Sequence, residues 1–95
     1  VNLIITGELN NKDFLTLKQL PNLSILDLEN IKNTEMPANV FEGKESLSKI
    51  TFPHNLIKIP DLACHKCKNL TQIEYFEKVK EIKNNENFKE ANYGR

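Results

Sequence analysis

Two consecutive stretches of the chain carry one pattern: residues 37–59 read PANVFEGKESLSKITFPHNLIKI, and residues 60–82 read PDLACHKCKNLTQIEYFEKVKEI. The two stretches have the same length and align without a gap. The matching pairs are Pro37 with Pro60, Leu47 with Leu70, Ile50 with Ile73, Phe52 with Tyr75, Leu56 with Val79, and Ile59 with Ile82. Repetition over such a length indicates a protein built from stacked structural repeats.

The same spacing of apolar residues extends toward the N-terminus. Residues 20–28 read LPNLSILDL, in which the phrase Leu-x-x-Leu-x-Leu begins twenty-four residues before its next copy, at residues 47–52. Residues 3–5 lie a further twenty-three residues upstream of residues 26–28. Alternating apolar residues predict one short strand in each repeat, with every second side chain facing inward, and successive repeats would stack these strands in parallel. The predicted strands are residues 3–5, 24–28, 49–52 and 72–75.

Between strands the chain must return across the other face, and the first return has the pattern of a helix. Asn11 is a suitable N-cap, KDFLTLKQL follows at residues 12–20, and Pro21 ends the pattern. The apolar residues expected on one side of this helix are Phe14, Leu17 and Leu20. Later returns are shorter, and we expect Gly43 to act as a helix C-cap and Asp61 as an N-cap.

Composition describes one small domain with an aliphatic core. The chain has 95 residues, and its 13 basic and 13 acidic side chains are interspersed, so no basic stripe favours nucleic acid. No apolar run reaches the length of about 18 residues that indicates membrane insertion. The chain opens at Val1 inside a predicted strand without the pattern of a secretion signal, which says nothing about export of the protein.

The stretch VFEGKESLSKITFPHNLIKI, residues 40–59, resembles the leucine-rich repeat of the BspA-like family, surface proteins of host-associated anaerobic bacteria. That repeat runs approximately Ala-Phe-x-x-Cys-x-x-Leu-x-x-Ile-x-(Ile/Phe)-Pro-x-x-(Val/Leu)-x-x-Ile. The resemblance covers residues 23–82, and the preceding segment is similar to the N-terminal cap region of such proteins. Three positions depart from the pattern: Lys44 stands where Cys is usual, Cys64 where Phe is usual, and Phe76 where a second Pro is usual.

This resemblance implies an α/β solenoid, a right-handed coil with short parallel strands, an N-terminal capping helix and short helical or irregular returns. We expect a single domain, residues 1–95, in which residues 1–22 form the cap region and residues 23–82 form the repeats. Residues 83–95 are expected to be a degenerate C-terminal end. Phe88 would begin an incomplete coil, and the remaining polar residues would either fray or cap the last repeat. The resemblance also implies export to the cell surface.

Both cysteines lie in LACHKCKNL, residues 62–70, and the repeat explains their positions. Cys64 lies one repeat after Phe41 and Cys67 lies one repeat after Lys44, so we interpret the pair as structural core residues. A reactive thiol pair remains open because lysines flank the motif, and an exported protein could oxidise the pair to a small-loop disulfide.

A zinc site is a further alternative for the two cysteines. A structural zinc needs four ligands, and His54 and His65 are the remaining nitrogen donors of the chain. His65 is adjacent to Cys64 in sequence, which is awkward for a shared tetrahedron. We therefore predict no metal and no cofactor.

Other motifs give little support for chemistry. Asn22 and Asn69 each begin an Asn-x-Ser/Thr sequence, but they occupy the same repeat position, so repetition explains both. The glycines are isolated, and the acidic pairs are better interpreted as solvated surface than as catalytic dyads. The chain is therefore predicted not to be an enzyme.

A stacked parallel sheet exposes alternate side chains on one face, where repeat proteins usually bind partners. The predicted binding face comprises Asn2, Ile4, Ile25, Asp27, Lys49, Thr51, Gln72 and Glu74. The first hypothesis is a non-catalytic binding module that contacts another protein or a host matrix component. The second is a structural spacer or part of a longer array, with self-association through an exposed terminal coil. The third is a thiol or zinc protein centred on Cys64 and Cys67.

Overall fold

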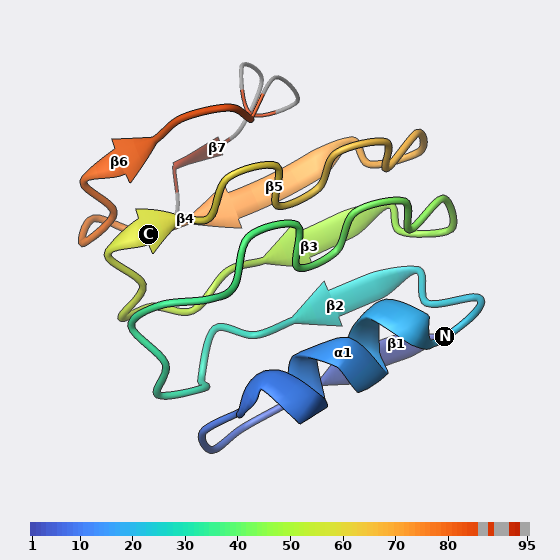
Figure 1. Cartoon of the computed structure of the whole chain (residues 1–95), viewed down its shortest axis with the longest axis horizontal. Coiled ribbons are helices and arrows are strands. Elements are labelled where there is room, and N and C mark those ends of the chain that lie inside the picture. Colours follow the sequence, from blue (N-terminus) through green and yellow to red (C-terminus); the bar gives the residue numbers. More distant parts are fainter. Residues whose placement is uncertain (86–87, 89–91, 94–95) are drawn as a thin grey trace.

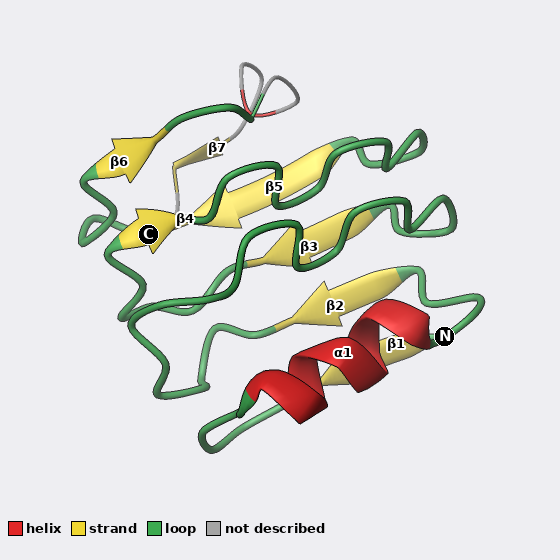
Figure 2. Cartoon of the chain, in the orientation of Figure 1, coloured by secondary structure: helices red, strands yellow, loops and turns green. Residues whose placement is uncertain are grey.

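The computed structural model describes residues 1–85, 88 and 92–93, and within them five short parallel strands form a sheet in chain order (Figure 1). The strands are β1 (Asn2–Ile4), β2 (Ile25–Asp27), β3 (Lys49–Thr51), β5 (Gln72–Tyr75) and β7 (Asn92–Tyr93). Figure 2 shows them side by side and running in one direction, with loops at both ends. The predicted strands are therefore present: β5 has the predicted bounds, β2 and β3 lie inside theirs, and β1 both begins and ends one residue earlier than predicted.

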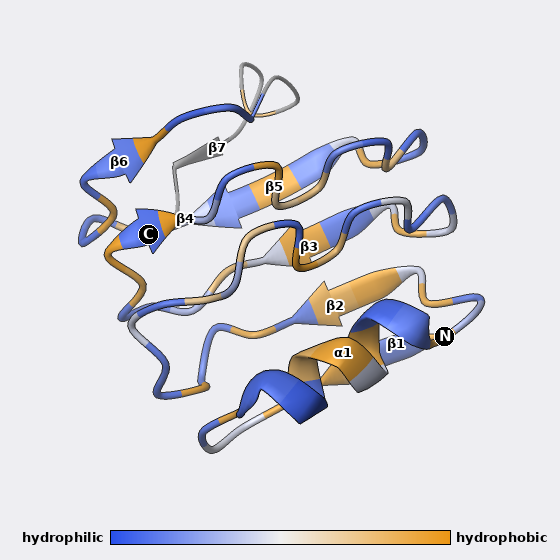
Figure 3. Ribbon diagram, viewed as in Figure 1, coloured by the Kyte–Doolittle hydropathy of each residue, from blue (hydrophilic) through white to orange (hydrophobic). Residues whose placement is uncertain are grey.

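The register of the sheet follows the repeat. Leu3 pairs with Leu26, Leu26 with Ile50, and Ile50 with Ile73. Leu26 and Ile50 are completely buried, and Figure 3 shows hydrophilic and hydrophobic residues alternating along β5, whereas β2 is hydrophobic over most of its length. Equivalent apolar side chains of successive coils therefore stack into one continuous column.

Helix α1 (Asn11–Gln19) occupies the first return, as predicted, and it lies on the same side of the sheet as the later returns (Figure 1). The expected N-cap, Asn11, is wrong by one residue. The side chain of Asn10 accepts a hydrogen bond from the Asp13 backbone N–H at 2.9 Å, and the Asp13 carboxylate accepts one from the Asn10 N–H at 2.9 Å. This reciprocal capping box needs an acidic or amide side chain three residues after the cap, and Asp13 provides it for Asn10.

The apolar side of α1 is narrower than the sequence pattern suggested. Phe14 and Leu17 are buried, whereas Leu20 is 38% exposed. Leu20 is the C-cap and has an extended backbone, so its side chain no longer follows the helical face. Pro21 follows immediately and prevents continuation of the helix.

The later returns are turns, so the expected roles of Gly43 as a helix C-cap and Asp61 as an N-cap are wrong. The physical reason is that backbone groups in these segments bond to the next coil. The N–H groups of Asn39, Phe41 and Gly43 donate to the carbonyls of Asp61, Ala63 and His65 at 2.8–2.9 Å. A helix would need the same donors for bonds within the segment.

Beyond these turns, β4 (Lys58–Ile59) and β6 (Glu81–Ile82) pair in parallel as a second small sheet (Figure 2). It lies on the return side, and its strands run opposite to those of the main sheet. The core between the two sides is a single cluster of aliphatic and aromatic side chains, with Phe41, Leu47, Phe52 and Leu56 fully buried.

The final segment is only partly described. Phe88 is buried, and its ring centroid lies 5.6 Å from that of Phe52, while β7 pairs with β5. The remaining part of the expected degenerate end, residues 86–87, 89–91 and 94–95, lies outside the described residues.

The buried column predicts the outcome of alanine substitutions. Leu26→Ala and Ile50→Ala should each lower the free energy of unfolding by about 2–5 kcal/mol, because a fully buried side chain leaves a cavity. Lys49→Ala, adjacent but facing outward, should change it by no more than about 0.5 kcal/mol. Urea unfolding of the three variants measures this, and equal tolerance at all three positions would refute the register.

Backbone geometry predicts two opposite effects in equivalent turns. Gly43 has φ +79° and Lys66, its equivalent in the following repeat, has φ +64°. Because L-residues are disfavoured there, Gly43→Ala should destabilise the protein and Lys66→Gly should stabilise it, each by about 0.5–1 kcal/mol. No atom lies within 4 Å of a Cβ added at Gly43, so a steric clash does not contribute. Urea unfolding of both variants tests this, and destabilisation by Lys66→Gly would contradict it.

Candidate functional site

The eight residues predicted as a binding face are brought together in two rows across the main sheet. Strand pairing aligns Asn2, Ile25, Lys49 and Gln72 in the first row, and Ile4, Asp27, Thr51 and Glu74 in the second. Each row runs from β1 to β5 and crosses four strands. Residues separated by more than seventy positions therefore contribute to one surface.

Exposure differs along these rows. Ile4, on β1 at the edge of the sheet, is 72% exposed. Thr51 is only 4% exposed, so the expectation that it offers an outward contact is wrong. It is a short side chain in register between Asp27 and Glu74, whose longer side chains flank it on both sides.

The charges on the face are of both signs. Asp27 and Glu74 lie in one row and Lys49 in the other. The Asp27 carboxylate accepts a hydrogen bond from the Glu29 N–H at 2.9 Å, which holds it at the end of β2. The surface thus offers two carboxylates and one ammonium at fixed spacings on a rigid sheet, an arrangement suited to recognition by charge pattern.

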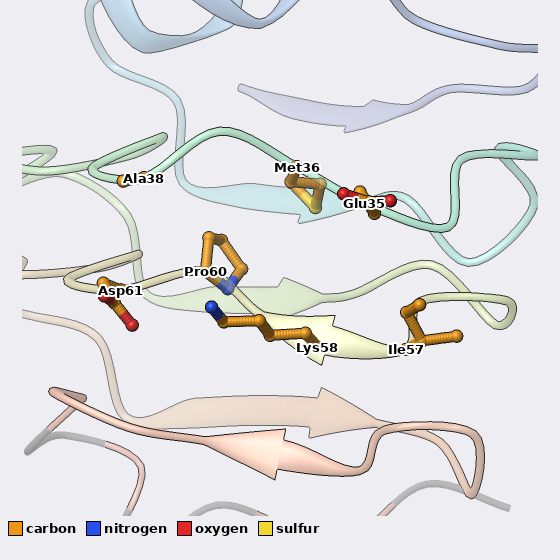
Figure 4. Close-up of a pocket in the computed structure, with 7 residues that line it drawn as sticks. All are labelled: Glu35, Met36, Ala38, Ile57, Lys58, Pro60 and Asp61. Carbon is orange, nitrogen blue, oxygen red and sulfur yellow. The ribbon is translucent and has the colours of Figure 1, made fainter.

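A groove on the return side was not found from the sequence. It has a volume of about 320 Å³ and is lined by Glu35, Met36, Ala38, Ile57, Lys58, Pro60 and Asp61. Figure 4 shows it between the segment before Pro37 and strand β4, with the Lys58 side chain extended toward Pro60. The N–H of Ile57 donates to the Thr34 carbonyl at 3.0 Å on one side of it.

The groove results from unequal spacing of two returns. Ile31 and Leu56 both close a turn, through N–H bonds to Leu28 and Pro53, yet the next matched apolar residues are Met36 and Ile59. Four residues lie between Ile31 and Met36, whereas two lie between Leu56 and Ile59. The longer segment does not pair with β4 as β6 does, which leaves the space open. This difference in spacing was visible in the sequence.

The opposite side of β4 is closed by ion pairs. Lys58 and Lys83 approach the Glu81 carboxylate at 3.4 and 3.0 Å. Hydrogen bonds from Lys83 and Lys58 hold the pKa of the Glu81 carboxyl below its ordinary value. These groups are solvent-exposed, so they fix local side-chain positions and contribute little to stability.

The two cysteines lie in the described part of the chain, are buried, and form no disulfide. The Cys67 thiol lies 3.1 Å from the Phe41 carbonyl, to which it donates. A hydrogen bond between the thiols lowers the pKa of Cys67 and raises that of Cys64 well above its ordinary value. Burial adds to the rise at Cys64 and opposes the fall at Cys67.

Lys44 is the unexpected residue beside this turn. It is only 6% exposed, and its Nζ donates to the Leu20 carbonyl at 2.7 Å and to the Lys18 carbonyl at 3.1 Å. Both carbonyls lie at the end of α1, where the helix leaves acceptors unsatisfied. Burial lowers the pKa of Lys44, and the nearby Cys67 opposes this. The sequence marked Lys44 as a departure from the repeat but not as the C-terminal cap of the helix.

The structure does not assemble the ligands that a zinc site would need. His65 is exposed, and His54 lies 3.9 Å from the Glu77 carboxylate and stacks on Phe76 at 4.7 Å between ring centroids. Within residues 1–85, 88 and 92–93, no group of three or more His, Cys, Asp or Glu side chains is placed to hold a metal. Within the same residues, no helix is long and apolar enough to cross a membrane.

Stacked parallel strands at the spacing of one repeat, turns on the return side and an N-terminal helix define a repeat protein of the leucine-rich class. A family model described as "BspA type Leucine rich repeat region (6 copies)" matches residues 2–93, and the chain belongs to this family. The match confirms the resemblance found in the sequence. No curated protein and no solved structure matches the chain.

The cap formed by Lys44 can be tested with a neutral side chain of similar length. Lys44→Met should lower the free energy of unfolding by about 1–3 kcal/mol, because the part-buried carbonyls at the end of α1 lose their donor. Lys32→Met, at an exposed position, is the matched control and should have an effect within about 0.5 kcal/mol. Urea unfolding distinguishes them, and equal stabilities would exclude a capping role for Lys44.

Proposed function

We propose that this chain is a non-catalytic binding module, built as a right-handed solenoid, of an exported bacterial surface protein. Its partner would be another protein, either a neighbouring surface protein or a host matrix component. The observation that carries the proposal is the pair of side-chain rows on the main sheet, which are contributed by four successive strands. The BspA-type family, typically surface-associated, supports the assignment to the cell surface.

The composition of the rows indicates the kind of partner. Ile4 and Ile25 supply apolar contact at the β1 side, whereas Asp27, Lys49 and Glu74 supply charges toward the centre. Such a face favours a partner surface that pairs a basic group with the carboxylates and buries a small apolar patch. Side chains held on adjacent strands need little ordering on binding, which favours recognition by a preformed surface.

Binding to solubilised extracellular-matrix proteins, immobilised on a sensor surface, tests the proposal. Asp27→Lys should weaken binding roughly tenfold or more, about 1.4 kcal/mol, because it reverses a charge in the centre of the face. Lys83→Glu, a charge reversal on the return side, is the control and should leave affinity unchanged. Equal effects of both variants, or no binding by the unsubstituted chain, would count against the binding face.

A second candidate function is a spacer or a part of a longer repeat array. The observation in its favour is β1, which pairs with β2 on one side and lies at the edge of the described sheet, with Val1 75% and Ile4 72% exposed. An uncovered edge strand with exposed apolar side chains is prone to pair with another chain.

The spacer hypothesis predicts concentration-dependent self-association. Sedimentation equilibrium should show dimers or larger species at high concentration, and Ile4→Lys at the β1 edge should reduce them. Lys78→Glu, which lies on an exposed turn away from β1, serves as the control. A chain that stays monomeric throughout the concentration range would exclude this hypothesis.

A further inference from the structure

The turn that carries Cys64 and Cys67 has the geometry of a disulfide site. The Cys67 N–H donates to the Cys64 carbonyl at 3.1 Å, which closes a four-residue turn. The ends of such a turn have Cα atoms within about 7 Å, and natural disulfides span about 4.4–6.8 Å. The two thiols are also within hydrogen-bonding reach of each other. The turn therefore brings the two cysteines to a separation close to the range that a disulfide spans.

The two sulfurs are not equivalent. Cys64 is fully buried at a position that carries Phe41 in the preceding coil, whereas Cys67 is 6% exposed at the rim of the turn. The exposed side chains beside Cys67 are Lys66 and Lys68. Cys67 is thus the sulfur that an external reagent meets first. The ammonium of Lys66 favours an anionic reagent, whereas that of Lys68 is paired with the Glu45 carboxylate at 3.4 Å.

The surroundings of Cys67 also favour its thiolate. Its contact with the Phe41 carbonyl stabilises the thiol, whereas the hydrogen bond from the Cys64 thiol and the nearby Lys44 ammonium stabilise the thiolate and lower its pKa. Burial opposes this shift, and the hydrogen bond from Cys64 is the largest cause of the lower pKa. A thiolate is the nucleophile in exchange with a disulfide.

We propose that Cys64 and Cys67 are a reversible oxidation site, which a small anionic disulfide such as oxidised glutathione converts to a disulfide within the turn. The Cys67 thiolate attacks one sulfur of the reagent, the reagent's S–S bond breaks, and one glutathione leaves as a thiolate, which takes up a proton from solvent. The sulfur of Cys64 then attacks Cys67 Sγ, the mixed disulfide breaks, and the second glutathione leaves as a thiolate that takes up the proton given up by Cys64. The protein dithiol is oxidised by two electrons, and the reagent is reduced to two thiols.

This site is independent of the proposed binding face and gives the chain a response to its redox compartment. The oxidised turn lies beside Gly43, whose N–H donates to the His65 carbonyl at 2.8 Å, and thus next to the Lys44 cap of α1. Oxidation would close the turn at residues 64–67 with a covalent bond in addition to its backbone hydrogen bond. It would also replace two hydrogen-bonded thiols by a cross-link that resists reduction only in an oxidising compartment.

The test is incubation of the native, reduced chain with oxidised glutathione, followed by acid quenching, alkylation and intact mass measurement. The expected product has lost two hydrogens, takes up no alkylating agent and returns to the dithiol in excess reduced glutathione. Cys64→Ser should accumulate the mixed disulfide with glutathione, whereas Cys67→Ser should remain unmodified until it is unfolded. If the folded chain stays a dithiol, or forms the intramolecular bond only in denaturant, the proposal is overturned.

The variant Lys44→Met distinguishes two explanations of Cys67 reactivity: activation of its thiolate by the Lys44 ammonium, and access to the thiol through local opening of the turn. If the ammonium favours the Cys67 thiolate, this variant should react several-fold more slowly than the unsubstituted chain at neutral pH, although it is less stable. Lys32→Met, at an exposed position outside the binding face, is the control and should react at the original rate. Faster reaction of Lys44→Met would show that local unfolding, and not a native thiolate, gives access to the pair, and it would overturn the native site.

Discussion

Parallel pairing of equivalent strands in successive coils is the constraint on which the rest of the structure depends. It places Leu3, Leu26, Ile50 and Ile73 in one column, each separated from the next by one repeat. Side-chain hydrogen bonds follow the same interval: Ser46 donates to the Leu23 carbonyl and Lys78 to the Asn55 side chain. Backbone pairing, apolar packing and polar contacts therefore all select one register, and a slip of one residue would disrupt all three.

The contacts at the end of α1 explain why Lys44 departs from the repeat pattern. A helix that ends against a stack of coils buries carbonyl groups which the next coil must satisfy. Lys44 does this with an ammonium group, at the position where the resembled repeat carries a cysteine. Its charge then lies beside Cys67 in the following coil and influences that thiol. The lysine that caps the helix thus also places a positive charge beside the buried Cys67.

The strands and the register could be predicted from the sequence because alternate apolar side chains leave a strong period-2 signal at a fixed interval. The N-cap could not be placed reliably because Asn10 and Asn11 are both good caps, and the deciding bond involves Asp13. The returns were expected to be short and helical or irregular, and they are turns. The helix-capping roles expected for Gly43 and Asp61 were wrong because the bonds of Asn39 and Phe41 to the next coil depend on stacking, which local propensity does not contain.

The positions of the candidate binding face on the sheet were predictable, but the exposure of each side chain was not. Strand alternation gives the direction of Thr51, while its burial depends on the size of its neighbours Asp27 and Glu74. The groove beside β4 and the cap at Lys44 were marked by local irregularities of the repeat. The groove and the cap themselves could not be predicted, because both depend on which segments lie side by side in the folded chain. In a repeat protein the regular positions thus specify the framework, and the irregular ones are where individual sites arise.

Stacking of the coils as one cooperative unit is tested most directly by amide hydrogen exchange measured by NMR. The Leu28 N–H donates to the Thr51 carbonyl and the Phe52 N–H to the Glu74 carbonyl, both at 2.9 Å, so these amides connect the coil of β2 to that of β3 and the coil of β3 to that of β5. Both amides are expected to exchange only through global unfolding and to give one free energy, equal to that from urea unfolding. Exchange of Phe52 at a much lower free energy than Leu28 would show that the coil of β5 separates independently, and it would contradict the single stacked register.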